Sequence, residues 1–213
     1  MAPLSRLIDG PAEAAVTLLL AHGAGAAMDS PFMDAMAHGL ANRGARVVRF
    51  EFPYMAKRRA DGRQRAPDRL PKLLDAFRQQ VAMENDTGKL VIGGKSMGGR
   101  LASLLVDELA AHSNVCGCLC LGYPFHPPGK PEQRRTTHLE TLSTPTLILQ
   151  GERDSFGRQG EVEGYNLSPA IAVQWITAGD HSFKPTRRSG LSEAGNWSQA
   201  LEYATHFLGQ VSR

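Results

Sequence analysis

The chain has 213 residues, of which 42% are hydrophobic and 21% are charged, and its net charge is +3. These values are ordinary for a soluble globular protein and predict a single domain over residues 1–213 with a sizeable core. They exclude a strongly basic, nucleic-acid-binding chain. No run reaches the ~20 apolar residues of a membrane-spanning helix.

Much of the positive charge is local. Residues 57–69 hold six basic side chains against two acidic ones, which predicts a basic loop. The loop is either a solvated surface turn or a rim that attracts an anionic substrate or partner.

Short apolar runs alternate with amphipathic stretches along the whole chain. This alternation predicts an α/β fold, a mostly parallel sheet of about six to seven strands with helices on both faces. No repeat or linker divides the chain. Strands are expected over residues 15–21, 45–52, 89–94, 115–122, 146–151 and 171–177, and helices over 31–43, 68–83, 97–111 and 197–208.

Two features bear on where the protein works. The apolar run at 14–21 has the length of a signal-peptide core, but Asp9 and Glu13 break the basic segment that should precede it. The three cysteines, Cys116, Cys118 and Cys120, alternate along one predicted strand, a spacing that suits neither a disulfide nor a zinc site. We interpret them as buried thiols and expect a cytoplasmic protein without a metal or another cofactor.

Residues 93–100, GGKSMGGR, fit two different motifs. A phosphate-binding P-loop needs a glycine five residues before Gly94, and that position is Lys89. The apolar residues 90–93 are also typical of a buried strand and not of an open loop. The P-loop interpretation therefore fails.

The other motif is the nucleophile elbow, G-x-S-x-G, at residues 94–98. An elbow needs a strand before the serine and a helix after it, so that the hydroxyl is exposed above the sheet. The predicted strand 89–94 precedes Ser96, and leucines at spacings of three and four predict a helix over 97–111. Ser96 is thus the candidate nucleophile.

The ends of two later strands supply a histidine and an acid. His181 follows the last predicted strand and is the candidate base, whereas the six other histidines lie in helical or loop contexts. Asp154 is the preferred acid, ahead of Glu152, while Asp180 is too close to His181 in sequence to face it well. The order serine, acid, histidine is that of α/β-hydrolases.

Further loops should surround Ser96. The turn His22-Gly23-Ala24-Gly25 follows the first strand, and its small residues would let backbone amides face a reacting carbonyl, with His22 fixing the turn. The candidate pocket residues are Gly25, Met28, Tyr123, Pro124 and Phe125. Packing within the loops is an equal alternative for the larger ones.

Together these motifs resemble the α/β-hydrolase superfamily, and within it the compact dienelactone-hydrolase-like group. The chain is especially similar to the hydrolase-like domain shared with a subunit of the NSL chromatin complex. The resemblance covers residues 15–208 and is carried by HGAG (22–25), MDSP (28–31), GKSMGGR (94–100), GYPFHP (122–127), GERD (151–154) and GDHSF (179–183).

The resemblance implies a minimal fold without a large cap. It also implies a triad of Ser96, Asp154 and His181, and an oxyanion hole built from the backbone N–H groups of Ala24 and Met97. The expected activity is hydrolysis of an ester, thioester or related acyl bond through an acyl-enzyme. The expected substrate is a small acyl compound, with an anionic compound as one option. The alternatives are a non-catalytic interaction domain that binds a protein partner, and a small serine peptidase.

Overall fold

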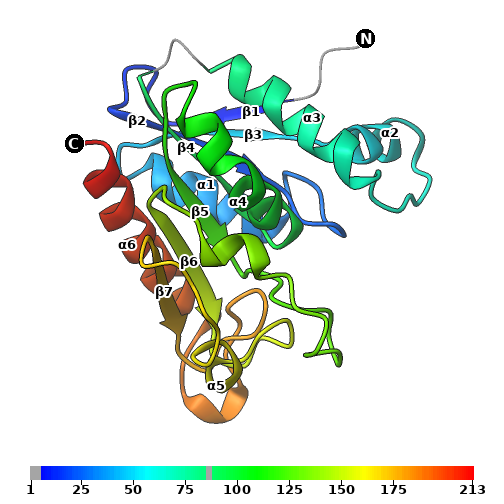
Figure 1. Ribbon diagram of the computed structural model, residues 1–213, viewed down its shortest axis with the longest axis vertical. Coiled ribbons are helices and arrows are strands. Elements are labelled where there is room, and N and C mark those ends of the chain that lie inside the picture. Colours follow the sequence, from blue (N-terminus) through cyan, green and yellow to red (C-terminus); the bar gives the residue numbers. More distant parts are fainter. Residues whose placement is uncertain (1–5, 85–87) are drawn as a thin grey trace.

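A computed structural model of the protein describes residues 6–84 and 88–213. Within them, seven strands form one sheet in the order β1-β3-β2-β4-β5-β6-β7 (Figure 1). All neighbouring strands are parallel except β1, which runs antiparallel to β3. The strands are β1 (Arg6–Asp9), β2 (Val16–Ala21), β3 (Arg46–Phe50), β4 (Lys89–Lys95), β5 (Val115–Leu121), β6 (Thr146–Gly151) and β7 (Ile171–Ile176).

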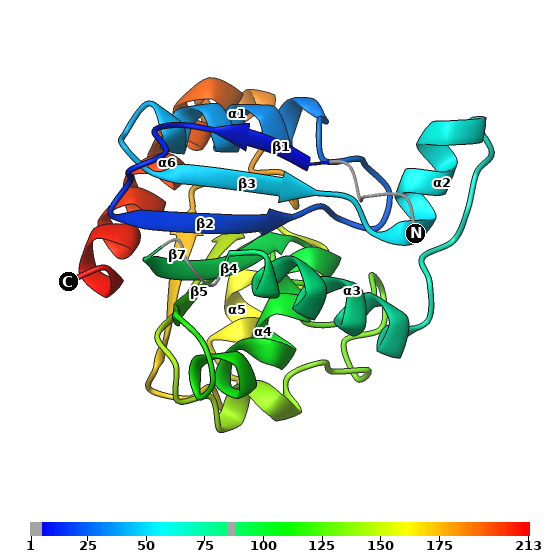
Figure 2. The same ribbon diagram turned by 90° about the horizontal axis from the view of Figure 1, so that it is seen from above.

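Helices cover both faces of the sheet, as the alternating pattern predicted (Figure 2). On one face α3 and α4 pack through residues such as Phe77 and Leu105, and on the other α1 and α6 pack through Met33 and Phe207. The sheet thus has a core on each side. The helices are α1 (Pro31–Ala41), α2 (Pro53–Asp61), α3 (Leu70–Ala82), α4 (Met97–Ala110), α5 (Gln159–Val162) and α6 (Glu193–Val211), with 3-10 turns η1 (Thr137–Glu140) and η2 (Arg187–Ser189).

The basic segment 57–69 is not a loop throughout, which corrects the prediction. Its first part belongs to α2, which begins at Pro53 and ends where Gly62 adopts a φ of 70°. Arg59 on this helix makes ion pairs with the fully buried Glu51 and with Asp29. Part of the predicted positive charge is therefore neutralised within the fold.

Helix α6 starts four residues earlier than expected. The side chain of Ser192 caps it by accepting a hydrogen bond from the N–H of Gly195 at 3.0 Å. A capping serine satisfies an N–H that the first turn leaves free, which offsets the low helix propensity of a glycine there.

The strand order places the ends of β2 and β4 side by side at the point where the order reverses. Ala21 on β2 pairs with Gly94 on β4, so the loops that leave the two strands begin together. In open parallel sheets, such a switch point is where ligands bind. The described segment between β5 and β6 carries only η1, so no helical cap arises there.

Candidate active site

The turn at Ser96 has the strained backbone of a nucleophile elbow. Ser96 adopts a φ of 52° and a ψ of −112°, values that an L-residue rarely adopts. A side chain added at Gly94 would place its Cβ 2.5 Å from the carbonyl oxygen of Ala21, and one at Gly98 would meet the same oxygen at 2.5 Å. The glycines of the motif therefore let β2, β4 and α4 approach closely, as the sequence predicted.

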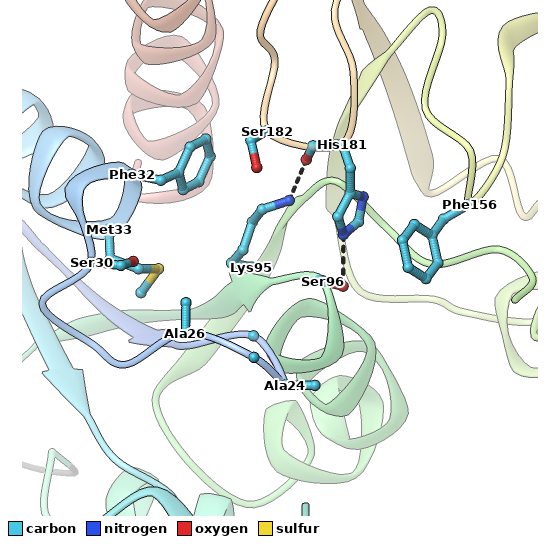
Figure 3. A pocket seen from close by; sticks show the side chains of 12 residues that line it. Ala24, Ala26, Ser30, Phe32, Met33, Lys95, Ser96, Phe156, His181 and Ser182 are labelled. Carbon is cyan, nitrogen blue, oxygen red and sulfur yellow. Dashed lines mark hydrogen bonds between the residues drawn. The ribbon is translucent and has the colours of Figure 1, made fainter. Parts of the chain in front are cut away.

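The hydroxyl of Ser96 lies beside the predicted base, His181 (Figure 3). Its Oγ is 2.9 Å from His181 Nε2, and His181 Nδ1 is 2.7 Å from Asp154 Oδ2. Asp154 is fully buried and also accepts hydrogen bonds from the side chain of Gln150 and the N–H of Phe156. Because the Nδ1–H group donates its hydrogen bond to the carboxylate, Nε2 carries no proton and can accept one from the serine.

The competing acids are engaged elsewhere. Glu152 accepts a hydrogen bond from the N–H of Ala178 at 2.7 Å. Asp180 accepts hydrogen bonds from the N–H groups of Ser182 and Lys184 at 2.8 and 3.0 Å, so it shapes the loop that carries the histidine. Of the three candidate acids, only Asp154 forms a hydrogen bond with the imidazole of His181.

Lys95, the residue before the nucleophile, turns its side chain toward the histidine loop (Figure 3). Its ammonium donates a hydrogen bond to the backbone carbonyl of His181 and lies 5.2 Å from the centroid of the Phe32 ring. Burial lowers the pKa of Lys95 to about 8. The neighbouring residues Lys95 and Ser96 thus have different roles: Ser96 supplies the hydroxyl, and Lys95 holds the backbone of the base, His181.

Burial also lowers the pKa of His181 below its usual range. The hydrogen bond to Asp154 opposes this shift, and the positive charge of Lys95 adds to it. The imidazole is therefore neutral at pH 7, which is the form that can accept a proton.

The turn after β2 is held by its own side chains. The Nδ1–H group of His22 donates to the carbonyl of Gly23 at 2.6 Å, and Nε2 accepts from the N–H of Phe52 at 3.1 Å. The hydroxyl of Tyr54 donates to the carbonyl of Ala24 at 2.9 Å. His22 is fully buried, and burial lowers its pKa, so it has the structural role that the sequence suggested.

The two predicted oxyanion-hole residues border the same space. Ala24 and Met97 both line a cavity that Ser96 also lines. Met97 is the first residue of α4, and its N–H therefore has no acceptor within the helix. The hydrogen bond from Tyr54 to the Ala24 carbonyl holds the peptide chain at this turn in place.

The predicted pocket residues separate into two groups. Gly25 lines a cavity of about 310 Å³ beside Ser96, together with Phe32, Met33 and Lys95, and Pro124 lines a second cavity at the serine. Met28, Tyr123 and Phe125 do not line either cavity: they are at most 2% exposed and pack inside the fold. For these three, loop packing is the correct alternative.

A second serine–histidine contact joins Ser103 on α4 to His138 in η1. Ser103 Oγ is 2.9 Å from His138 Nε2, but Ser103 is buried and the hydroxyl of Tyr123 is the other recorded neighbour of this ring nitrogen. Burial, with a smaller effect of Arg100, lowers the pKa of His138 to about 4. Among the described residues, no carboxylate orients His138 by a hydrogen bond, and Ser103 lies within α4 and not at the elbow.

Three residues of the site were not found from the sequence. Lys95 occupies a variable position of the G-x-S-x-G motif, although a lysine at the end of a buried strand is itself unusual. Phe156, two residues after Asp154, stacks on the imidazole of His181 with the ring centroids 4.3 Å apart. Gln150, inside β6, holds the acid. In the sequence, only closeness to Asp154 could have pointed to Phe156 and Gln150.

The sheet order, the elbow at the end of β4 and the groups at the ends of β6 and β7 define an α/β-hydrolase fold. A family model described as an alpha/beta hydrolase domain matches residues 14–209, so the chain belongs to the α/β-hydrolase family. This confirms the predicted superfamily and an enzyme of the hydrolase class. The narrower similarity to the NSL-complex subunit stays a prediction.

Solved structures show the same fold at low sequence identity. A dienelactone hydrolase from Anabaena variabilis has a TM-score of 0.74 at 19% identity, covering 99% of this chain and 93% of its own. A thermophilic esterase from Thermogutta terrifontis has a TM-score of 0.71 at 16% identity, covering 100% and 97%. A serine hydrolase without lid from Xanthomonas campestris has a TM-score of 0.67 at 20% identity, covering 95% and 88%.

No helix of the described residues is both long and apolar enough to cross a membrane. The cysteines are free thiols: Cys118 and Cys120 are buried and Cys116 is partly buried.

Proposed function

We propose that the protein is a serine hydrolase that cleaves a carboxylic ester, thioester or related acyl bond through an acyl-enzyme. The observation that carries the proposal is the continuous line of contacts from Ser96 to His181 to Asp154, with the serine on a strained elbow. Strain of this kind persists in a fold mainly where function requires it.

In the proposed mechanism, His181 Nε2 accepts the proton of the Ser96 hydroxyl while Oγ attacks the acyl carbon. Asp154 stabilises the imidazolium that results, and the amides of Ala24 and Met97 donate to the oxyanion. The imidazolium then protonates the leaving group. Water, activated by the same histidine, attacks the acyl-enzyme and releases the acid.

This reaction class agrees with the structural neighbours, which include a dienelactone hydrolase and an esterase. Those names describe the neighbours themselves. The alternatives, an interaction domain without catalysis and a small serine peptidase, share the fold, so a chemical test has to separate them.

The test is covalent labelling with a fluorophosphonate probe. We expect the wild type to be labelled and Ser96→Ala to be unlabelled, while the control Ser103→Ala is labelled like the wild type because its serine lies outside the elbow.

Asp154→Asn should keep the fold and lose roughly 10³–10⁴-fold in kcat/KM on 4-nitrophenyl esters, because the imidazolium loses its counter-charge.

Absence of labelling in the wild type, or equal labelling of Ser96→Ala, would contradict a serine hydrolase and favour the interaction domain. A panel of acyl esters, thioesters and peptides, each compared with Ser96→Ala, separates the esterase from the peptidase.

A further inference from the structure

A second cavity, of about 440 Å³, opens on the nucleophile. It shares Ala24, Ser96 and Phe156 with the first cavity. The charged residues differ: Lys95 lines the first cavity, whereas Arg100, Arg135 and Asp68 line the second. Both arginines are only partly exposed. The chain therefore places two positive charges beside the serine, apart from the basic segment 57–69.

Neither guanidinium has a partner in the described part of the chain. The Nε atom of Arg100 is buried without any hydrogen bond, and no ion pair or side-chain hydrogen bond is recorded for Arg100 or Arg135. By contrast, Arg49 is paired with Asp9 and Asp34, and Arg78 with Glu108. A buried donor without an acceptor costs free energy, so an acceptor absent from the protein itself is expected here.

The electrostatics of the cavity point to an anion. Arg100 is the fourth residue of α4, so its charge lies at the helix end where the macrodipole disfavours a cation. Burial lowers the pKa of Arg135, and the charge of Arg100 lowers it further. An anion held between the two guanidinium groups would relieve both unfavourable interactions.

The backbone fixes Arg135 in place. Its N–H donates to the carbonyl of Phe125 at 2.8 Å, and its carbonyl accepts from the hydroxyl of Tyr123 at 2.9 Å. The acidic side chain on the cavity wall, Asp68, has one oxygen bonded to Lys72 and forms no ion pair with either arginine among the described residues. The other oxygen, Asp68 Oδ2, is buried without a hydrogen bond. The lining thus sets two guanidinium groups against one carboxylate, which leaves an excess of positive charge.

We propose that this cavity is an oxyanion-binding subsite, and that the substrate carries a carboxylate or phosphate group on its acyl portion. The proposal rests on the proposed function of Ser96. The leaving group receives its proton from His181, and His181 lines the first cavity and not the second. The acyl portion therefore extends into the second cavity, toward Arg100 and Arg135.

The first experiment compares two substrates that differ only in charge: the 4-nitrophenyl monoester of glutaric acid, with a free carboxylate, and its methyl-capped neutral counterpart. The wild type should prefer the charged ester. In Arg100→Gln and Arg135→Gln, kcat/KM for the charged ester should fall about 10- to 100-fold, the range for one hydrogen bond to a charged group, with the neutral ester changed about threefold or less.

Two variants serve as controls. Arg134→Gln changes an exposed neighbour whose guanidinium stacks over Tyr165, and it should keep the preference of the wild type. Arg100→Lys keeps the charge but loses the forked guanidinium that binds an anion through two hydrogen bonds. It should therefore prefer the charged ester more than Arg100→Gln does and less than the wild type does. Equal charged-to-neutral ratios in the wild type and the arginine variants would overturn the proposal.

The second experiment needs no catalysis. Calorimetric titration of Ser96→Ala with inorganic phosphate and with glutarate should detect binding of at least one anion, and adding Arg100→Gln should abolish it. Tighter binding of phosphate identifies a phosphorylated substrate, and tighter binding of glutarate a carboxylated one. Binding of neither overturns the subsite. Binding of an anion by a protein that a fluorophosphonate does not label would refute the hydrolase while the subsite holds.

Discussion

At the scale of single residues, the position of Lys95 is the least expected part of the site. An ammonium is rarely buried unless it is paired, and here it lies against Phe32 and donates to the carbonyl of His181. Its charge disfavours the imidazolium, while its hydrogen bond fixes the loop that carries the imidazole. These two effects on the base can be separated by their pH dependence.

For the wild type, we expect kcat/KM to rise as His181 loses its proton, with a midpoint below the usual value of about 6.5, because burial lowers the pKa of His181. Lys95→Met removes the charge and keeps the length of the side chain. The pKa of His181 should then increase, and the acid limb should move to higher pH. The measurement is the pH profile of kcat/KM on a neutral ester.

Lys184→Met is the matched control, because Lys184 is exposed and lies three residues after His181. Its profile should match that of the wild type. An acid limb that stays in place or moves to lower pH in Lys95→Met would show that Lys95 acts only through the carbonyl contact.

The sequence predicted the residues whose position in the chain decides their position in space. Ser96, Asp154 and His181 each follow a parallel strand, and strand ends meet at one edge of the sheet. Where the side chains of Lys95 and Arg100 point depends instead on the unusual φ and ψ of Ser96 and on the rotation of α4 about its axis. The spacing of residues along the chain does not determine either. For that reason the charges around the nucleophile were missed.

At the scale of elements, the elbow depends on a close approach of β2, β4 and α4. A Cβ at Gly98 would lie 2.5 Å from the carbonyl oxygen of Ala21 and 2.8 Å from that of His22. Both neighbours are backbone atoms of the strand and turn that lead to the oxyanion loop, so they cannot rotate away as a side chain could. Any adjustment would displace the elements themselves.

We therefore expect Gly98→Ala to reduce the free energy of unfolding by about 1–3 kcal/mol, the cost of overpacking, and to lower kcat/KM as Ser96 moves from the turn at Ala24. Urea denaturation and esterase kinetics measure the two effects. Gly209→Ala, in the exposed last turn of α6 where a Cβ meets no atom within 4 Å, should be neutral or slightly stabilising. Equal stability of the two variants would contradict the close-packed elbow.

The elements that the sequence missed lie where local pattern is weak. β1 has four residues at the sheet edge, and its Ile8 is 55% exposed, so alternation is short and incomplete. α2 is rich in charge, and it is held by the burial of Tyr54 and Met55 and by the ion pairs of Arg59, none of which a periodicity count detects. Long-range contacts, not propensity, determine both.

At the scale of the whole molecule, the fold holds the strained turn at Ser96 between two packed faces. β4 lies at the centre of the sheet, with the core of α3 and α4 on one face and that of α1 and α6 on the other. These contacts fix the end of the strand, so Ser96 keeps a φ of 52° that would relax in an open loop. Stability and activity should therefore oppose each other at this position.

Ser96→Gly should make the protein inactive and more stable. Glycine adopts a positive φ without a steric cost, and the strain removed, of order 1–3 kcal/mol, exceeds the 0.5–1 kcal/mol that glycine loses in chain entropy. With a net gain of about 1 kcal/mol, Tm should increase by about 2–4 °C in scanning calorimetry. Ser96→Ala is the matched comparison, because it loses the same hydroxyl and the same bond to His181 while keeping a Cβ. If Ser96→Gly melts at or below the temperature of Ser96→Ala, the backbone at the nucleophile is not strained, and the elbow would need another explanation.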